Sequence, residues 1–176
     1  MNNRAPSKRH LKWLSTGTCR VLVACALLAW TQALQAQTQE LIASYIESWT
    51  DFYPSTAFGQ GNRQSALRFE DFSDPRLDVW LDINHRAEEA LSSLPGNTPL
   101  NDRVDAQVLL RQVKMELDLW KQDKVLSQQP QWYTAQISEA LTYVLVSEKL
   151  SPAEKRQAVL NRLDGIRALC TVAIDK

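Results

Sequence analysis

Histidine and its acidic neighbours are the residues of this sequence best suited to metal or acid–base chemistry. His85 is followed by Glu88 and Glu89, which is close to the His-x-x-Glu-His pattern of one class of zinc protease. The last position holds Glu89, however, and residues 37–176 contain no second histidine. Because such a site needs several ligands or titratable groups in one place, we interpret His85 as a solvated residue on a helix face.

Two shorter patterns are also incomplete. Gly59-Gln-Gly61 matches part of a phosphate-binding glycine motif, but Gln64 replaces the third glycine and no predicted strand precedes it. Cys170 has no histidine within its own helix. We interpret it as a small apolar residue on a buried helix face, with a free reactive thiol or an intermolecular bridge as the alternative.

Carboxylates are dense enough in one region to consider a Ca²⁺ site, since Ca²⁺ takes six to eight oxygens. The cluster consists of Glu70, Asp71, Asp74, Asp78 and Asp82. The glycine of an EF-hand is absent, and acids in the first turn of a helix are already favoured by the helix dipole. We therefore predict no catalytic, cofactor-binding or metal site in this chain.

Residues 1–36 have the order of a secretory signal peptide. Basic residues without any acid come first, and an apolar run follows from Val21 to about Leu34. The run is too short to cross a bilayer as a helix. We expect cleavage near Ala36 and a periplasmic or secreted protein without a stable membrane anchor. An uncleaved segment would make the protein membrane-associated, and a mature N-terminus at Gln37 or nearby would exclude this.

A lipoprotein signal is the rival interpretation of this segment. Leu22-Val-Ala-Cys25 fits the lipidation pattern, but Arg20 leaves too short an apolar run before Cys25. Beyond the signal, residues 37–176 keep 15 of the 20 Lys and Arg and all 20 Asp and Glu, a formal charge of −5. This charge argues against nucleic acid as a partner. Cys170 is then the only cysteine left, so no internal disulfide is expected.

The sequence predicts an all-α protein in which the signal peptide precedes about five antiparallel amphipathic helices, part of a larger helical bundle. Apolar residues recur three and four positions apart, and no segment alternates like a half-buried strand over more than four residues. The predicted elements are a first helix over 37–53, a loop over 54–72, and a helical bundle region over 73–176 with helices at 73–95, 101–122, 132–149 and 152–174.

Local signals mark where two of these helices begin. Asp74 is expected to cap the second helix, with Pro75 at its first position. Ser151 and Glu154 are expected to form a capping box at the start of the last helix. The buried side of that last helix is expected to consist of Val159, Leu163, Ile166, Cys170 and Ala173.

Five segments follow one another in an order and spacing that are specific when taken together. They are Trp49-Thr-Asp-Phe-Tyr-Pro-Ser-Thr-Ala-Phe-Gly59, Arg103-Val-Asp-Ala-Gln-Val-Leu-Leu110 with Glu116, Pro130-Gln-Trp-Tyr133, Ser151-Pro-Ala-Glu154 and Asn161-Arg-Leu-Asp-Gly-Ile-Arg-Ala-Leu169. Together they resemble the N-terminal helical region of the bacterial family called domain of unknown function 885. Relatives commonly have Gly-x-His after the first helix, where this chain has Gly59-Gln-Gly61.

The resemblance implies a role in a larger protein. Members of that family are typically several times longer, mostly helical, frequently exported and similar to zinc metallopeptidases. Their His-Glu and Pro-Gly-His elements lie far downstream of the matched region and have no counterpart here, so zinc is implied only for full-length relatives. The resemblance implies that these helices form one wall of a substrate cleft and that the missing C-terminal catalytic region is their partner.

The expected function follows from these observations. The last predicted helix runs to the end of the sequence without a stop signal. We expect an exported N-terminal fragment of a metallopeptidase-like hydrolase, truncated before its catalytic motif and inactive alone. The alternative is a complete small periplasmic binding or scaffolding protein, which would be monodisperse and would melt cooperatively.

Overall fold

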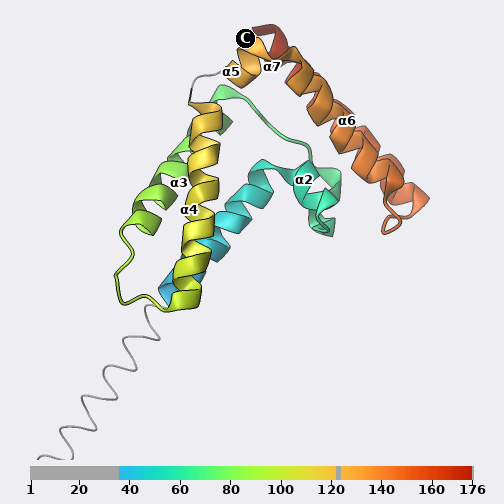
Figure 1. Ribbon diagram of the computed structural model, residues 1–176. Helices are drawn as coiled ribbons and strands as arrows, with labels where there is room; N and C mark the ends of the chain where they lie inside the picture. Colours follow the sequence, from blue (N-terminus) through green and yellow to red (C-terminus); the bar gives the residue numbers. More distant parts are fainter. Residues whose placement is uncertain (1–35, 122–123, 176) are drawn as a thin grey trace, which may run out of the picture.

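The computed structural model describes residues 36–121 and 124–175 (Figure 1). The predicted signal peptide therefore lies, except for its last residue, outside the described residues. Both described ranges are all-α, without a strand. Residues 36–52 form the first helix, and it is followed by α2 (Pro54–Gly59), the 3-10 helix η1 (Arg63–Leu67), α3 (Asp74–Ser92), α4 (Leu100–Trp120), α5 (Lys124–Gln128), α6 (Pro130–Val146) and α7 (Pro152–Asp175). None of the helices in these ranges has the length and apolar content needed to span a membrane.

Two helical hairpins account for most of the fold (Figure 1). α3 and α4 pack against each other and form one group with the first helix. α6 and α7 form the second hairpin, and α2 and η1 pack against it. The connections within the hairpins, 93–99 and 147–151, are short, which favours antiparallel neighbours.

A core rich in aromatic rings lies among the first helix, α3 and α4 and reaches α6. Phe52 stacks on Trp80 with ring centroids 4.7 Å apart. Phe72 lies edge-on to Trp132 of α6, with centroids 4.8 Å apart. Since each such ring buries roughly 150–250 Å² of apolar surface, this cluster holds the hairpins together. A smaller core beside it contains Phe58, Ala66, Val144, Leu150 and Ala158.

The segment 54–72, predicted as a loop, contains two short helices, so that prediction is wrong. α2 begins with Pro54 in its first turn, and the side chain of Asn62 caps η1. Elements of six and five residues are too short to show a period of 3.6, which is why the sequence pattern missed them. The same reason explains α5, which lies in the predicted break before α6. Phe58 and Phe72 are buried within this segment.

The beginnings of α3 and α7 test the capping predictions. α3 starts at Asp74 and follows Ser73, so Asp74 lies in the first turn instead of at the cap position. The capping box of α7 is confirmed. The Ser151 N–H donates to Glu154 at 2.7 Å, and the Glu154 N–H donates to the Ser151 hydroxyl oxygen at 3.3 Å.

The buried face of α7 is rotated from the predicted one by the angle between neighbouring residues, 100°. Three residues of the predicted face, Val159, Ile166 and Ala173, are half-buried. Leu163 and Cys170 were expected inside and are exposed. The structure instead buries Ala158, Arg162 and Leu169. The prediction failed because an arginine in an amphipathic pattern is normally assigned to the solvent side.

Arg162 is completely buried and makes its hydrogen bonds to the backbone. Its guanidinium donates from Nε to the Ala66 carbonyl at 3.1 Å, from Nη1 to the Ala140 carbonyl, and from Nη2 to the Ser65 carbonyl at 3.4 Å. The same group lies 5.4 Å from the centroid of the Phe58 ring. Burial lowers the pKa of Arg162. Through the Arg162 side chain, α7 thus contacts η1, α2 and α6.

Replacing this residue tests its role. We expect Arg162→Ala to reduce the free energy of unfolding by about 3 kcal/mol or more, because three buried carbonyls lose their donor and a cavity remains. Arg156→Ala is the matched control on the exposed side of the same helix, and it should change stability by less than ~0.5 kcal/mol. Urea denaturation measures both. Equal stabilities for the two variants would contradict the role of Arg162 in holding α7 against η1, α2 and α6.

Candidate functional site

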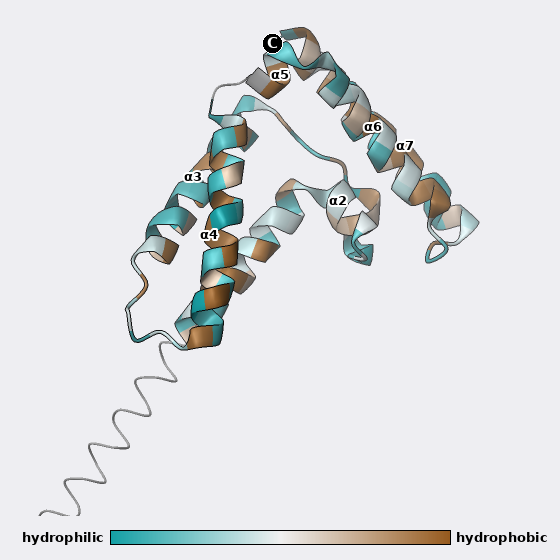
Figure 2. Cartoon of the chain, in the orientation of Figure 1, coloured by the Kyte–Doolittle hydropathy of each residue, from teal (hydrophilic) through white to brown (hydrophobic). Residues whose placement is uncertain are grey.

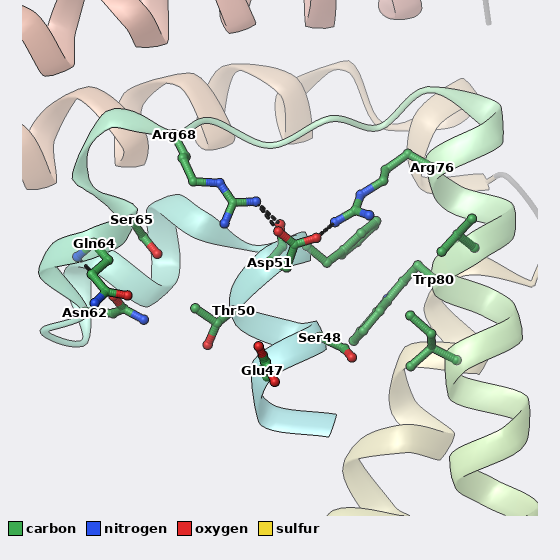
Figure 3. Close-up of a pocket in the computed structure, with 13 residues that line it drawn as sticks. Glu47, Ser48, Thr50, Asp51, Asn62, Gln64, Ser65, Arg68, Arg76 and Trp80 are labelled. Atoms are coloured by element: carbon green, nitrogen blue, oxygen red, sulfur yellow. Dashed lines mark hydrogen bonds and ion pairs between the residues drawn. The ribbon is translucent and has the colours of Figure 1, made fainter. Parts of the chain in front are cut away.

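A hollow of about 500 Å³ lies between the end of the first helix, η1 and the start of α3 (Figure 3). This volume is within the range of small-ligand sites, about 300–1,000 Å³. Its charged lining residues are Glu47, Asp51, Arg68 and Arg76. Hydroxyl, amide and apolar side chains complete the lining, and these are Ser48, Thr50, Asn62, Gln64, Ser65, Phe52, Val79, Trp80 and Ile83.

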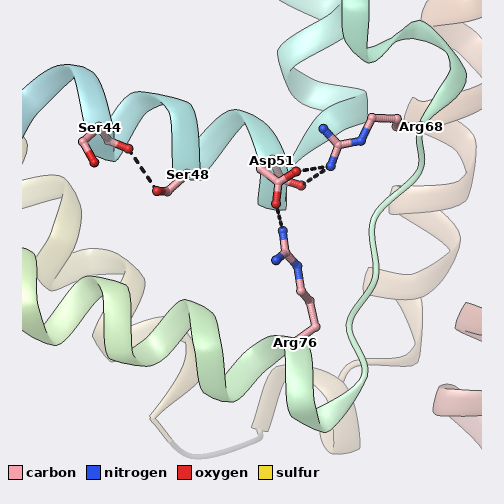
Figure 4. A network of polar contacts seen from close by, with 5 residues as sticks. All are labelled: Ser44, Ser48, Asp51, Arg68 and Arg76. Atoms are coloured by element: carbon pink, nitrogen blue, oxygen red, sulfur yellow. Dashed lines mark hydrogen bonds and ion pairs between the residues drawn. The ribbon is translucent and has the colours of Figure 1, made fainter.

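Asp51 is the centre of this hollow, because two arginines converge on it (Figure 4). Nη2 of Arg68 donates to one carboxylate oxygen and also, at 3.0 Å, to the backbone carbonyl of Asp51. Nη2 of Arg76 donates to the other carboxylate oxygen. All three side chains remain partly exposed, with 47% exposure for Asp51, 45% for Arg68 and 30% for Arg76. The exposure leaves the group accessible to a ligand.

Local structure explains why these residues meet. Asp51 lies in the last turn of the first helix, and Arg68 directly follows η1 in extended backbone. The chain then turns into α3, where the Asp71 side chain accepts a hydrogen bond from the Ser73 N–H at 2.9 Å. Arg76 is in the first turns of α3. The carboxylate therefore joins both ends of the 68–76 connection to the first helix.

The arginines keep the Asp51 carboxylate ionised. Partial burial alone would raise the pKa of Asp51, but the hydrogen bonds and positive charges of Arg76 and Arg68 outweigh it and lower that pKa. The guanidinium of Arg76 also lies 5.9 Å from the centroid of the Phe52 ring.

A buried carboxylate, Glu116 of α4, lies behind the aromatic side chains that line the hollow. It accepts hydrogen bonds from the Tyr53 hydroxyl at 2.7 Å, from Trp80 Nε1 at 3.2 Å and from Trp120 Nε1 at 3.3 Å. Burial and the nearby Glu116 charge raise the pKa of Tyr53, so its hydroxyl stays protonated and donates. Gln112 adds a fourth donor at 3.2 Å. This network joins α3, α4 and the end of the first helix.

The lining of the hollow offers charged, hydroxyl and amide groups to a ligand. The Ser48 hydroxyl donates to the Ser44 carbonyl at 2.9 Å (Figure 4). Two guanidiniums in a partly enclosed hollow are suited to holding a carboxylate or phosphate group.

The structure separates the residues that the sequence patterns identified. His85 is exposed on α3, at a groove between α3 and α4. Gly59 lies in α2, where a Cβ would come 2.6 Å from the Tyr143 ring. Gly61 has a φ of +107°, a conformation that favours glycine in the turn after α2. These glycines serve packing and turn geometry at the positions where a phosphate motif was considered.

The acidic cluster is also dispersed. Glu70 is buried and accepts a hydrogen bond from the Ser55 N–H at 2.8 Å, and burial raises the pKa of its carboxyl group. Asp78 and Asp82 are exposed on α3. Within the described ranges, the structure places no group of three or more His, Cys, Asp or Glu residues where they could hold a metal ion.

Sequence reasoning missed the residues that line the hollow. Asp51, Arg68 and Arg76 lie up to 25 positions apart. They fall in three different predicted elements, namely the first helix, the loop over 54–72 and the helix over 73–95. The sequence does place Arg68 and Arg76 on either side of Glu70, Asp71 and Asp74. Whether the two arginines meet at Asp51 depends on the turn into α3, which no periodic pattern specifies.

The described part of the chain is all-α and carries a partly exposed arginine–aspartate site. Comparison with known proteins found no matching family model, no matching curated protein and no matching solved structure.

The ion-pair network predicts a pH-dependent contribution to stability. Asp51 has a folded-state pKa below its ordinary value, so its contribution is complete above about pH 4 and decreases as the pH falls further. We expect Asp51→Asn to reduce the free energy of unfolding at pH 7 by on the order of 1 kcal/mol, a value that allows for solvent screening of exposed pairs.

Urea denaturation at neutral and acidic pH checks this, with Asp105→Asn as the control. Asp105 is exposed on α4 and should show a much smaller loss at neutral pH. The difference between wild type and Asp51→Asn should shrink as the pH falls below about 4. A stability difference that grows as the pH falls would contradict the lowered pKa of Asp51.

Proposed function

We propose that this chain is a non-catalytic helical wall, the N-terminal helical region of a protein like those of domain of unknown function 885. In this proposal it is exported and packs against the catalytic region of a metallopeptidase-like hydrolase. One observation carries the proposal: α4 has apolar side chains on both of its faces.

The inner face of α4 is buried in the core. Ala106, Val113 and Leu117 are buried there, and Glu116 and Trp120 join the buried polar network. The opposite face presents a second set of large apolar side chains to solvent. Its members are Leu100 at 65% exposure, Val104 at 49%, Val108 at 67%, Met115 at 61% and Leu119 at 42%. We call these five residues the α4 stripe.

The α4 stripe runs along the length of the helix. With 100° per residue, its five members fall within a sector of about 100°. Arg111 lies inside this sector, between Val108 and Met115, and Asp118 lies at its edge. Figure 2 shows hydrophobic bands repeating along α4, which lies at the front of its helical group. A helix that is apolar on opposite sides is typical of one buried between two layers.

The size of the α4 stripe indicates what kind of partner fits it. Its exposed area is on the order of a few hundred Å², a size at which exposed apolar patches often mark interaction sites. A stable dimer buries about 800 Å² on each partner, more than this stripe offers to a second copy of the chain. A larger helical body that also contacts the neighbouring groove at Ile46 and Trp49 fits the surface better.

A binding experiment tests this proposal. The catalytic region of a member of the family, produced without its own N-terminal helices, should bind the purified chain in calorimetric titration. Val108→Asp should weaken that binding at least about tenfold, because a buried, unpaired carboxylate is costly. Gln107→Asp adds the same charge to an exposed position outside the stripe and should have little effect. Absence of saturable binding, or equal effects of the two variants, would refute the proposed docking.

A small-molecule binding protein is the second candidate function. The observation that favours it is the Asp51 hollow, where two partly exposed guanidiniums line a volume suited to a small ligand. This candidate does not require the α4 stripe to be covered.

A further inference from the structure

Two acidic and two basic side chains line the Asp51 hollow, and the two signs lie on different sides of it. Glu47 and Asp51 lie on the first helix, four residues apart, so both face the same side. Arg68 and Arg76 come from the opposite side, after η1 and from α3 (Figure 3). The hollow therefore has no net charge from these four groups. A ligand that carries both signs fits such a lining better than a simple anion does.

The guanidiniums have donors left for a ligand. Each uses only Nη2 for its hydrogen bonds to Asp51. Within the described residues, the other N–H groups of Arg68 and Arg76 make no hydrogen bond that would occupy them. A guanidinium offers five N–H donors in a planar arrangement that matches a carboxylate. A second carboxylate can therefore bind beside Asp51.

Glu47 supplies the opposite end of the site. It is exposed, and no ion pair or hydrogen bond to it is present in the described part of the chain. Four residues of helix, a rise of about 6 Å, separate it from Asp51 along the helix axis. Two extended residues span about 7 Å, so a molecule of dipeptide length places its ammonium and carboxylate groups at these two ends.

An apolar wall lies beside the charged groups. Val79 is 48% exposed, and Ile83 is partly exposed one turn further along α3. The edge of Trp80 completes this side of the hollow. An apolar side chain on the ligand can pack here.

We propose that the Asp51 hollow binds a short zwitterionic peptide of dipeptide size. Arg68 and Arg76 hold its carboxylate, Glu47 holds its ammonium group, and Val79 and Ile83 contact its side chain. This proposal is independent of docking through the α4 stripe, because the hollow lies within the chain itself.

The dipeptide Ala-Leu is the probe, titrated into the purified chain by calorimetry. Saturable binding is expected. The N-acetylated dipeptide and the C-terminally amidated dipeptide each lack one charge and should bind about tenfold more weakly. These comparisons use the unchanged protein, so they do not depend on the folding of any variant.

Variants then assign the contacts. Arg76→Gln should weaken Ala-Leu binding about tenfold, whereas Arg86→Gln, an exposed position of the same helix outside the hollow, should not. Glu47→Gln should weaken binding of Ala-Leu but not of its N-acetylated form. Asp51→Asn should strengthen binding several-fold, because it removes the carboxylate that competes for both guanidiniums.

Two results would overturn the proposal. One is the absence of saturable Ala-Leu binding to both the wild type and Asp51→Asn. The other is equal affinity for the three peptides, which would show binding without recognition of the charged ends. Failure here with intact docking of the catalytic region would reject only this site. Failure of docking with intact peptide binding would reject only the helical-wall proposal.

Discussion

The buried carboxylate of Glu116 is the interaction on which the arrangement of the first helical group depends. It is 7% exposed and is satisfied by Tyr53, Trp80 and Trp120, which come from three parts of the chain. A buried carboxylate without donors is costly, so the network is favourable only when these elements are all in place. The network determines which side of α4 faces the core. The α4 stripe therefore lies on the opposite side, exposed to solvent.

Arg162 plays the corresponding role in the second helical group. Its contacts with the backbone of η1 and α6 determine which side of α7 is inside. Glu116 and Arg162 both belong to segments on which the resemblance to domain of unknown function 885 rests. In this structure they stabilise the fold and lie outside the lining of the Asp51 hollow.

Much of the fold could be predicted from the sequence, because long helices show their periodicity directly. The all-α class follows from residues spaced three and four apart. The face of α7 could not be predicted this way, since a fully buried arginine reverses the usual assignment of polar residues. α2, η1 and α5 were too short to show a period. The Asp51 site depends on the 68–76 connection bringing together residues from separate elements, and that geometry is not encoded in local spacing.

The central claim is that the outer face of α4 is covered by a larger helical partner. Met115 reports on this directly, because it lies in the α4 stripe at 61% exposure and Met1 is the only other methionine. Peroxide oxidation of Met115, followed by mass spectrometry, measures its access to solvent. The account predicts rapid oxidation in the isolated chain and at least about tenfold slower oxidation in the complex with the catalytic region. An unchanged oxidation rate in a saturated complex would contradict it.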